Sequence, residues 1–100
     1  MSESLRIVQG NKTALGLTAA TVVQQTINEY TPTRIVRAHV LVAGTTAGAV
    51  YDAVSTAGNT ATNQVAVIPN AVGTYLIDTP CLAGLVVVPG TGQTVSIVYE

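Results

Sequence analysis

The sequence is poor in charged and aromatic side chains. Of its 100 residues, four are Lys or Arg and five are Asp or Glu; it has no Phe, no Trp and four Tyr. About a quarter of the residues of a typical soluble domain are charged. A surface with so few charges gives little repulsion between copies, so we expect the folded chain to cover part of its outside in an assembly. The scarcity of cations also argues against nucleic-acid binding, which needs a basic surface.

Cysteine, histidine and long apolar runs are equally scarce. Cys81 is the single cysteine and His39 the single histidine, so the chain can form neither an internal disulfide nor a His/Cys metal cluster by itself. It has no uninterrupted apolar stretch of about 20 residues, as a membrane-spanning helix would need. The N-terminus lacks the basic and apolar regions of a secretory signal. We therefore expect no cofactor, no metal and no membrane partner.

The sequence is rich in short, β-branched, alternating segments that are separated by turn residues. This pattern predicts strands at residues 34–43, 49–54, 64–68, 73–79, 85–88 and 94–99. Residues 13–25 also fit a helix because Ala, Leu and Gln favour one, but Gly16, the threonines and the Val22-Val23 pair favour strands.

The spacing of these segments, at about 10 residues, predicts an all-β fold with seven or eight strands. We expect one domain over residues 13–100, either a single-domain antiparallel β-sandwich of the jelly-roll kind or a small barrel. The more polar residues 1–12 are expected to form an N-terminal arm.

The C-terminal segment 82–100 is the most apolar part of the chain. Two apolar runs flank Pro89-Gly90-Thr91-Gly92, where the proline and the glycines require a chain reversal. The pattern favours a β-hairpin. Because neither strand carries a charge, we place both at the centre of a sheet that is covered on both faces.

Residues 34–43 give the clearest alternation. Val36, Ala38, Val40 and Val42 would lie on the core side, and the opposite side would carry the mixed set Ile35, Arg37, His39 and Leu41. A mixed face of this kind suits a contact with another subunit. Together with Leu5, Ile7 and Val8 of the arm, these four residues form our predicted interface.

Catalytic and ligand-binding motifs are weak. Cys81 and His39, oriented by Asp52 or Asp78, could form a nucleophilic couple, but nothing in their spacing supports it. Gly90-Thr91-Gly92 joins two strands and opens no helix, so it is expected to be a turn and not a phosphate loop. We expect no catalytic residues and no enzymatic activity.

Most of the chain beyond residue 13 falls into three stretches: ALGLTAATVV, RIVRAHVLVAGTTAGAVYDA and NQVAVIPNAVGTYLIDTPCLAGLVVVPGTGQTVSIVY. Together they resemble small structural proteins of tailed bacteriophages. The likeness is strongest in IPN, GxYxID, PC and VVVPGTGQ, and the most similar group is that of the capsid decoration, or cement, proteins. The resemblance implies a β domain that forms small rings and brings no catalytic residues.

These observations lead to one expectation and one alternative. The expected protein is made in the host cytoplasm and decorates the virion, on the capsid surface, as a homo-oligomer (a trimer rather than a dimer) bound to the major capsid protein. The alternative is a receptor- or glycan-binding module of a tail or head fibre, which would use the polar loop Ser55 to Asn63 and nearby tyrosines.

Overall fold

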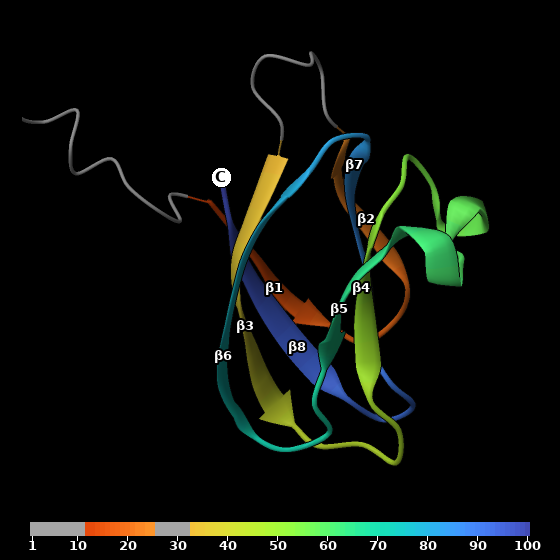
Figure 1. Ribbon diagram of the computed structural model, residues 1–100. Coiled ribbons are helices and arrows are strands. Elements are labelled where there is room, and N and C mark those ends of the chain that lie inside the picture. Colours follow the sequence, from red (N-terminus) through yellow and green to blue (C-terminus); the bar gives the residue numbers. More distant parts are fainter. Residues whose placement is uncertain (1–11, 26–32) are drawn as a thin grey trace, which may run out of the picture.

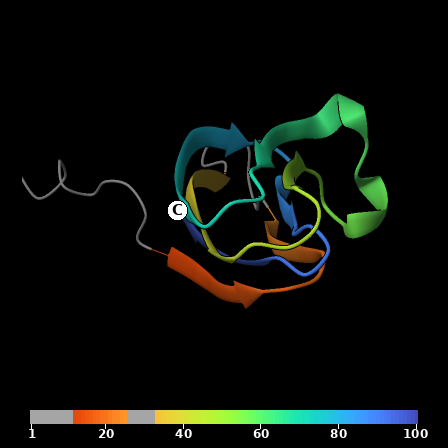
Figure 2. The same ribbon diagram turned by 90° about the horizontal axis from the view of Figure 1, so that it is seen from below.

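The computed structural model describes residues 12–25 and 33–100 and is a sandwich of two four-stranded antiparallel sheets (Figure 1). Sheet A has the order β1-β8-β3-β6 and sheet B the order β2-β7-β4-β5. The strands are β1 (Lys12–Leu17), β2 (Thr21–Gln25), β3 (Thr33–Val42), β4 (Gly48–Asp52), β5 (Gln64–Ile68), β6 (Gly73–Cys81), β7 (Gly84–Val88) and β8 (Thr94–Tyr99). Figure 2 shows the two layers from one end. The predictions of an all-β class and of a sandwich are confirmed.

Residues 13–25 form strands and no helix. β1 begins at Lys12, one residue before the predicted start of the domain, and Gly16 takes a φ of 64° at a bulge in β1. The described ranges contain only short turns of 3-10 helix, η2 (Thr56–Gly58) and η3 (Ala61–Asn63), and no helix in them is long and apolar enough to cross a lipid bilayer. The arm predicted for residues 1–12 lies, except for Lys12, outside the described residues.

The strand pairs are nested. β4 pairs with β5, β3 with β6, β2 with β7 and β1 with β8, all antiparallel. As a result, consecutive strands lie in different sheets throughout the chain, with the exception of β4 and β5.

The C-terminal segment is not a hairpin, contrary to the prediction. β7 belongs to sheet B and β8 to sheet A, so the loop at residues 89–93 crosses from one layer to the other. Proline and glycine determine that the chain reverses there, but not whether the returning strand pairs with its predecessor. The predicted central position is confirmed, because β7 lies between β2 and β4, and β8 lies between β1 and β3.

The core fills the space between the sheets with small and aliphatic side chains, of which each Val, Leu or Ile contributes about 1.5–3 kcal/mol on burial. Its members are Ile35, Ala38, Val40, Cys81, Val95 and Ile97 from sheet A and Val50, Ile68, Leu85 and Val87 from sheet B.

The strand β3 does not alternate as simply as its sequence does. Ile35 lies opposite Tyr99 and Arg37 opposite Val98, so Val36 is an extra residue in a β-bulge. The bulge turns Ile35 into the core, where it is 0% exposed, and the prediction that it belongs to the mixed outer set is wrong. Val42, predicted as core, is 51% exposed at the strand end.

Three loops at one end of the sandwich, at the bottom of Figure 1, are joined to one another. They are residues 43–47, 69–72 and 89–93, and we call this region the tied end. The Asn70 side chain accepts a hydrogen bond from the Gly44 N–H (2.7 Å) and donates one to the Gly44 carbonyl (2.9 Å). The fully buried Gln93 accepts from the Gly90 N–H (3.0 Å) and donates to the Pro69 carbonyl (3.0 Å).

Two glycines let the loops of the tied end approach so closely. A Cβ on Gly90 would collide with the carbonyl oxygen of Thr46, and a Cβ on Gly44 would collide with that of Thr91. The two backbones are also linked directly, since the Thr45 N–H donates to the Thr91 carbonyl at 2.8 Å. The tied end therefore holds together the β3–β4 loop and the β7–β8 loop, which both cross from one sheet to the other.

Candidate functional site

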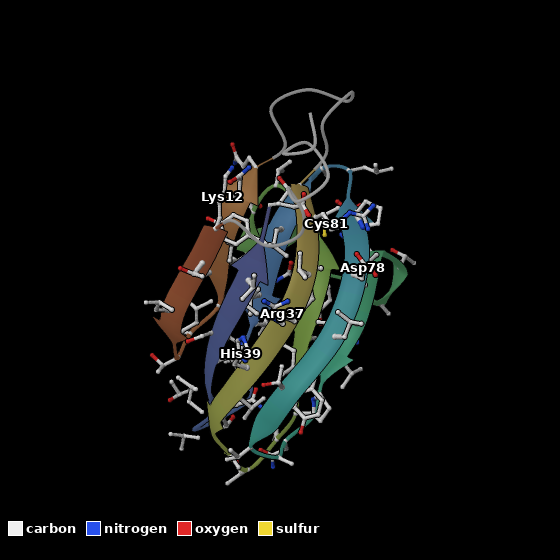
Figure 3. The ribbon with its side chains drawn as sticks, turned by 90° about the vertical axis from the view of Figure 1, so that its left-hand side faces the viewer. Lys12, Arg37, His39, Asp78 and Cys81 are labelled. Carbon is white, nitrogen blue, oxygen red and sulfur yellow. The ribbon has the colours of Figure 1, made fainter. Side chains whose placement is uncertain are left out.

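The outer face of sheet A displays the basic side chains of β3. Arg37 lies opposite Val98 on β8 and Leu76 on β6, and His39 lies opposite Ser96 and Thr74. Because Ala38, between them, points into the core, both side chains point away from it, as Figure 3 shows. The bulge at Val36 thus places Arg37 and His39 at the middle of the sheet, on its outer side.

Three leucines are exposed near these basic groups. Leu76 on β6 is 75% exposed, Leu15 on β1 is 74% exposed, and Leu41 near the end of β3 is 53% exposed. Exposed leucines beside an arginine are typical of protein contact surfaces, in which apolar side chains and Arg are enriched. We define the sheet A face as Leu15, Arg37, His39, Leu41 and Leu76.

The two arginines of β3 differ in their charge environment. Arg34 forms an ion pair with Asp78 at 2.9 Å, and Asp78 takes a φ of 52° at a bulge in β6. In the described part of the chain, Arg37 has no carboxylate at ion-pair distance. Arg37 is half-buried as a residue, and its guanidinium carries five N–H donors in a planar fork.

Besides Asp78, the described acidic residues are Asp52 and Glu100. Asp52 accepts hydrogen bonds from the backbone N–H groups of Leu82 (2.9 Å), Ala83 (2.7 Å) and Gly84 (3.2 Å), and so fixes the turn between β6 and β7. Its role is therefore structural.

The hypothetical Cys81–His39 couple is not assembled. Cys81 is fully buried in the core, whereas His39 lies on the outer side of sheet A, where its Nδ1 is 2.9 Å from the Thr74 hydroxyl. Burial, and secondarily the negative charge of Asp52, raise the pKa of the Cys81 thiol to about 12, so it is protonated at neutral pH. Among residues 12–25 and 33–100, no three His, Cys, Asp or Glu side chains group to hold a metal ion.

The outer face of sheet B has a different character. Val86 on β7 lies between Val22 on β2 and Tyr51 on β4, and Ala49 on β4 lies between Val88 and Val67. None of these side chains is charged, and the most exposed are Val67 at 58% and Val22 at 36%. As far as the described residues form it, this face is apolar and offers no ionic group to a partner.

The three described tyrosines do not gather around the polar loop as the fibre alternative would require. Tyr75 and Tyr99 pack against the core, and the Tyr75 hydroxyl donates to the Ala71 carbonyl at 2.8 Å. Tyr51 lies on the outer side of sheet B. The loop itself contains a capping box, in which the Asn63 side chain accepts from the Thr60 N–H at 2.9 Å.

Of the predicted interface residues, the structure brings Arg37 and His39 to one side of sheet A, exposes Leu41 at a second register shift near the end of β3, and buries Ile35. Leu5, Ile7 and Val8 lie outside the described residues. Leu15 and Leu76 are not among the interface residues predicted from sequence. Leu76 had a usable signal, because it alternates with Tyr75 and Ile77, which both face the core.

Comparison with known proteins gives no match: no family model fits the chain, and no curated protein or solved structure is significantly similar to it.

Proposed function

We propose that this chain is a non-enzymatic structural protein of a tailed-bacteriophage virion, which decorates and stabilises the outside of the capsid as a homo-oligomer and binds the major capsid protein. The observation that carries the proposal is the sheet A face, where Leu76 lies beside Arg37 and two further leucines are exposed, on a molecule with few charges. Such a surface is suited to burial against other proteins. The resemblance of the three sequence stretches supplies the virion as the place of that contact.

We further propose that the sandwich is a jelly roll. A jelly roll is a double sheet of eight strands built from two Greek keys, and it is common in viral capsid proteins. The strand pairing supports this assignment. β1 pairs with β8, β2 with β7, β3 with β6 and β4 with β5. This nested order arises when one long antiparallel hairpin is folded so that its strand pairs alternate between two sheets. Fold alone does not determine function, so this supports the virion proposal without carrying it.

The proposal is tested with phage particles that are made without the protein. We expect these particles to assemble but to release DNA at lower temperature, or on osmotic shock, and to recover resistance when the purified protein is added. Particles that resist heat equally and fail only to adsorb to cells would refute decoration and favour the fibre module.

Self-association is tested separately by light scattering on the purified protein. We expect a stable homo-oligomer, with a trimer favoured, because specific interfaces bury several hundred Å² or more on each subunit. A monodisperse monomer at tens of micromolar would refute the homo-oligomer for the protein in solution.

A further inference from the structure

Residues 12–25, which we call the strap, form one side of the sandwich and lie against the remaining strands, which we call the body (Figure 2). In the described part of the chain, β1 pairs only with β8 and β2 only with β7, so the strap gives each sheet one edge strand. None of its residues is buried, and Ala14, Leu17 and Val23 pack against the core while remaining partly exposed. The strap therefore covers the body without supplying a fully buried side chain.

The opposite side of the sandwich is held more firmly. Its edge strands β5 and β6 contain the fully buried Ile68 and Cys81, and the loop that connects them, residues 69–72, is part of the tied end. The turn between β1 and β2, residues 18–20, also lies toward that end. Among the described residues, however, no hydrogen bond joins this turn to the three loops of the tied end. The strap is thus the edge of the sandwich that opens with the least loss of contacts.

Every contact of the strap is one that another copy of the chain offers in the same form. Besides the strand pairs, the strap is joined to the body by hydrogen bonds from the Gly16 N–H to the Ser96 hydroxyl (3.2 Å), from the Gln24 amide to the Thr33 hydroxyl (3.3 Å) and from the Gln25 amide to the Val54 carbonyl (2.9 Å). A second copy's strap would make the same bonds, so only the covalent link through residues 26–32 favours the chain's own strap. A link of this length spans at most about 25 Å, so exchange needs two copies to meet at the end opposite the tied end.

We propose that the strap is exchanged between copies: in the homo-oligomer, residues 12–25 of one copy lie along the edges of β7 and β8 of a second copy. This inference rests on the homo-oligomer of the proposed function and names the surface that joins its subunits. Exchange keeps every strand pair and brings two charge-poor bodies together, so it adds apolar burial that the closed monomer lacks. When each copy donates its strap to the next, the assembly closes into a ring, which suits a trimer as well as a dimer.

The test uses two variants of the full-length chain with one added cysteine each, Thr13→Cys in the strap and Val98→Cys in β8. The two positions are opposite each other in the register, with Cα atoms about 4.5–5.5 Å apart, a separation that a disulfide bridges. The variants are mixed in urea under reducing conditions, refolded together at tens of micromolar and then treated with oxidised glutathione. Cys81 is fully buried, so the oxidant reaches only the added thiols.

We expect a disulfide between position 13 of one chain and position 98 of another, identified by peptide mapping. Complete exchange should link about half of the chains, since about one strap in four then joins the two variants in the required order. Ala49→Cys mixed with Val67→Cys is the matched control, because these residues are opposite each other on β4 and β5, outside the strap. Equal linking of copies by the control pair would overturn the inference.

A chain with both Thr13→Cys and Val98→Cys gives the converse test. Refolded and oxidised at a concentration too low for copies to meet, it locks its own strap, and it should then stay monomeric in light scattering when concentrated. Its reduced form should have the oligomeric mass of the wild type. An oligomer of the locked chain, or the absence of the disulfide between chains, would overturn exchange and leave the homo-oligomer and decoration standing. A monomeric wild type would instead refute the homo-oligomer itself, and the inference with it.

Discussion

The tied end and the sheet A face use polar side chains in opposite ways. At the tied end, the amides of Asn70 and Gln93 are turned inward onto backbone groups of neighbouring loops, and each makes two hydrogen bonds. On the sheet A face, the Arg37 side chain points outward and has no described ionic partner. The first region stabilises the fold, and the second has donors to offer a partner.

This difference explains why the most distinctive sequence motifs indicate no catalytic or binding function: their residues hold the loops of the tied end together. Asn70 belongs to IPN, and Gly90 and Gln93 belong to VVVPGTGQ; all three act in the tied end. The residues of the sheet A face come from three separate strands and form no sequence motif. Substitutions should therefore separate the two regions, with large losses of stability at the tied end and small ones on the face.

The largest effect is expected for Gly90→Ala. The added Cβ would collide with the backbone of Thr46, which cannot move away as a flexible side chain would. We expect a loss of about 3 kcal/mol in the free energy of unfolding, and a Tm lower by more than about 10 °C. Thr91→Ala in the same loop changes an exposed side chain and should cost less than about 0.5 kcal/mol. Equal Tm values for the two variants would contradict the close approach of the loops.

The next effect is expected for Gln93→Leu. The substitution keeps the volume but leaves the buried Gly90 N–H without its partner, and also the Pro69 carbonyl, which is only partly buried and so costs less. Each unsatisfied group costs about 1–3 kcal/mol, so urea unfolding should show a loss of about 2–3 kcal/mol. Gln64→Leu, at an exposed glutamine at the start of β5, is the comparison and should change stability by less than about 0.5 kcal/mol.

A smaller effect is expected for Asn70→Ala. Its two hydrogen bonds to Gly44 are accessible to water, which replaces them in part, so we expect a loss of about 1–2 kcal/mol by urea unfolding. Thr45→Ala removes only a long bond of 3.4 Å to the Thr91 carbonyl and should cost clearly less. If Thr45→Ala costs as much as Asn70→Ala, the amide of Asn70 does not hold the loops together.

The pH dependence of stability tests the position of Cys81 inside the sandwich. Its pKa is raised from 9.0 to about 12, so the folded state keeps the thiol protonated while the unfolded state loses the proton above pH 9. The contribution of the thiol to stability is therefore complete below pH 9 and is lost as the pH rises toward 12. Between pH 8 and pH 10, the wild type should lose about 1 kcal/mol more than Cys81→Ala. Parallel pH profiles would contradict burial of the thiol.

The smallest effects on stability are expected on the sheet A face. Leu76→Ser removes a side chain that is 75% exposed, and His39→Gln replaces the contact with the Thr74 hydroxyl. Each should change the free energy of unfolding by less than about 0.5 kcal/mol in urea titrations. A loss above about 1 kcal/mol for Leu76→Ser would show that this leucine supports the fold and is not merely displayed.

The strands could be predicted from sequence, but their partners could not. Residues 64–68 form a strand as predicted, and the long strand at 34–43 is shifted by one residue at each end. Local alternation and turn residues determine such segments. β7 pairs with β2 and β4, and β8 pairs with β1 and β3, which separates the two strands into different sheets. The sequence of residues 82–100 does not specify these partners.

The candidate surface was predictable in part. Arg37 and His39 were placed on one side of their strand, as the structure has them, and Leu41 is exposed beyond a second register shift. Ile35 was misplaced because the bulge at Val36 shifts the alternation by one residue, and a period of two cannot reveal a bulge. Leu15 and Leu76 come from other strands, so their nearness to Arg37 depends on the sheet order.

The nested pairing has a consequence for how the chain reaches its fold. β4 and β5 form the one pair of consecutive strands within a sheet, and every wider pair encloses the narrower ones until β1 meets β8. Contacts between distant residues must therefore form before either sheet is complete, which makes folding slow. A chain emerging from the ribosome leaves β1 and β3 without their shared neighbour until residues 94–99 are made, and loss of β8 alone would expose both strands to pairing with other chains.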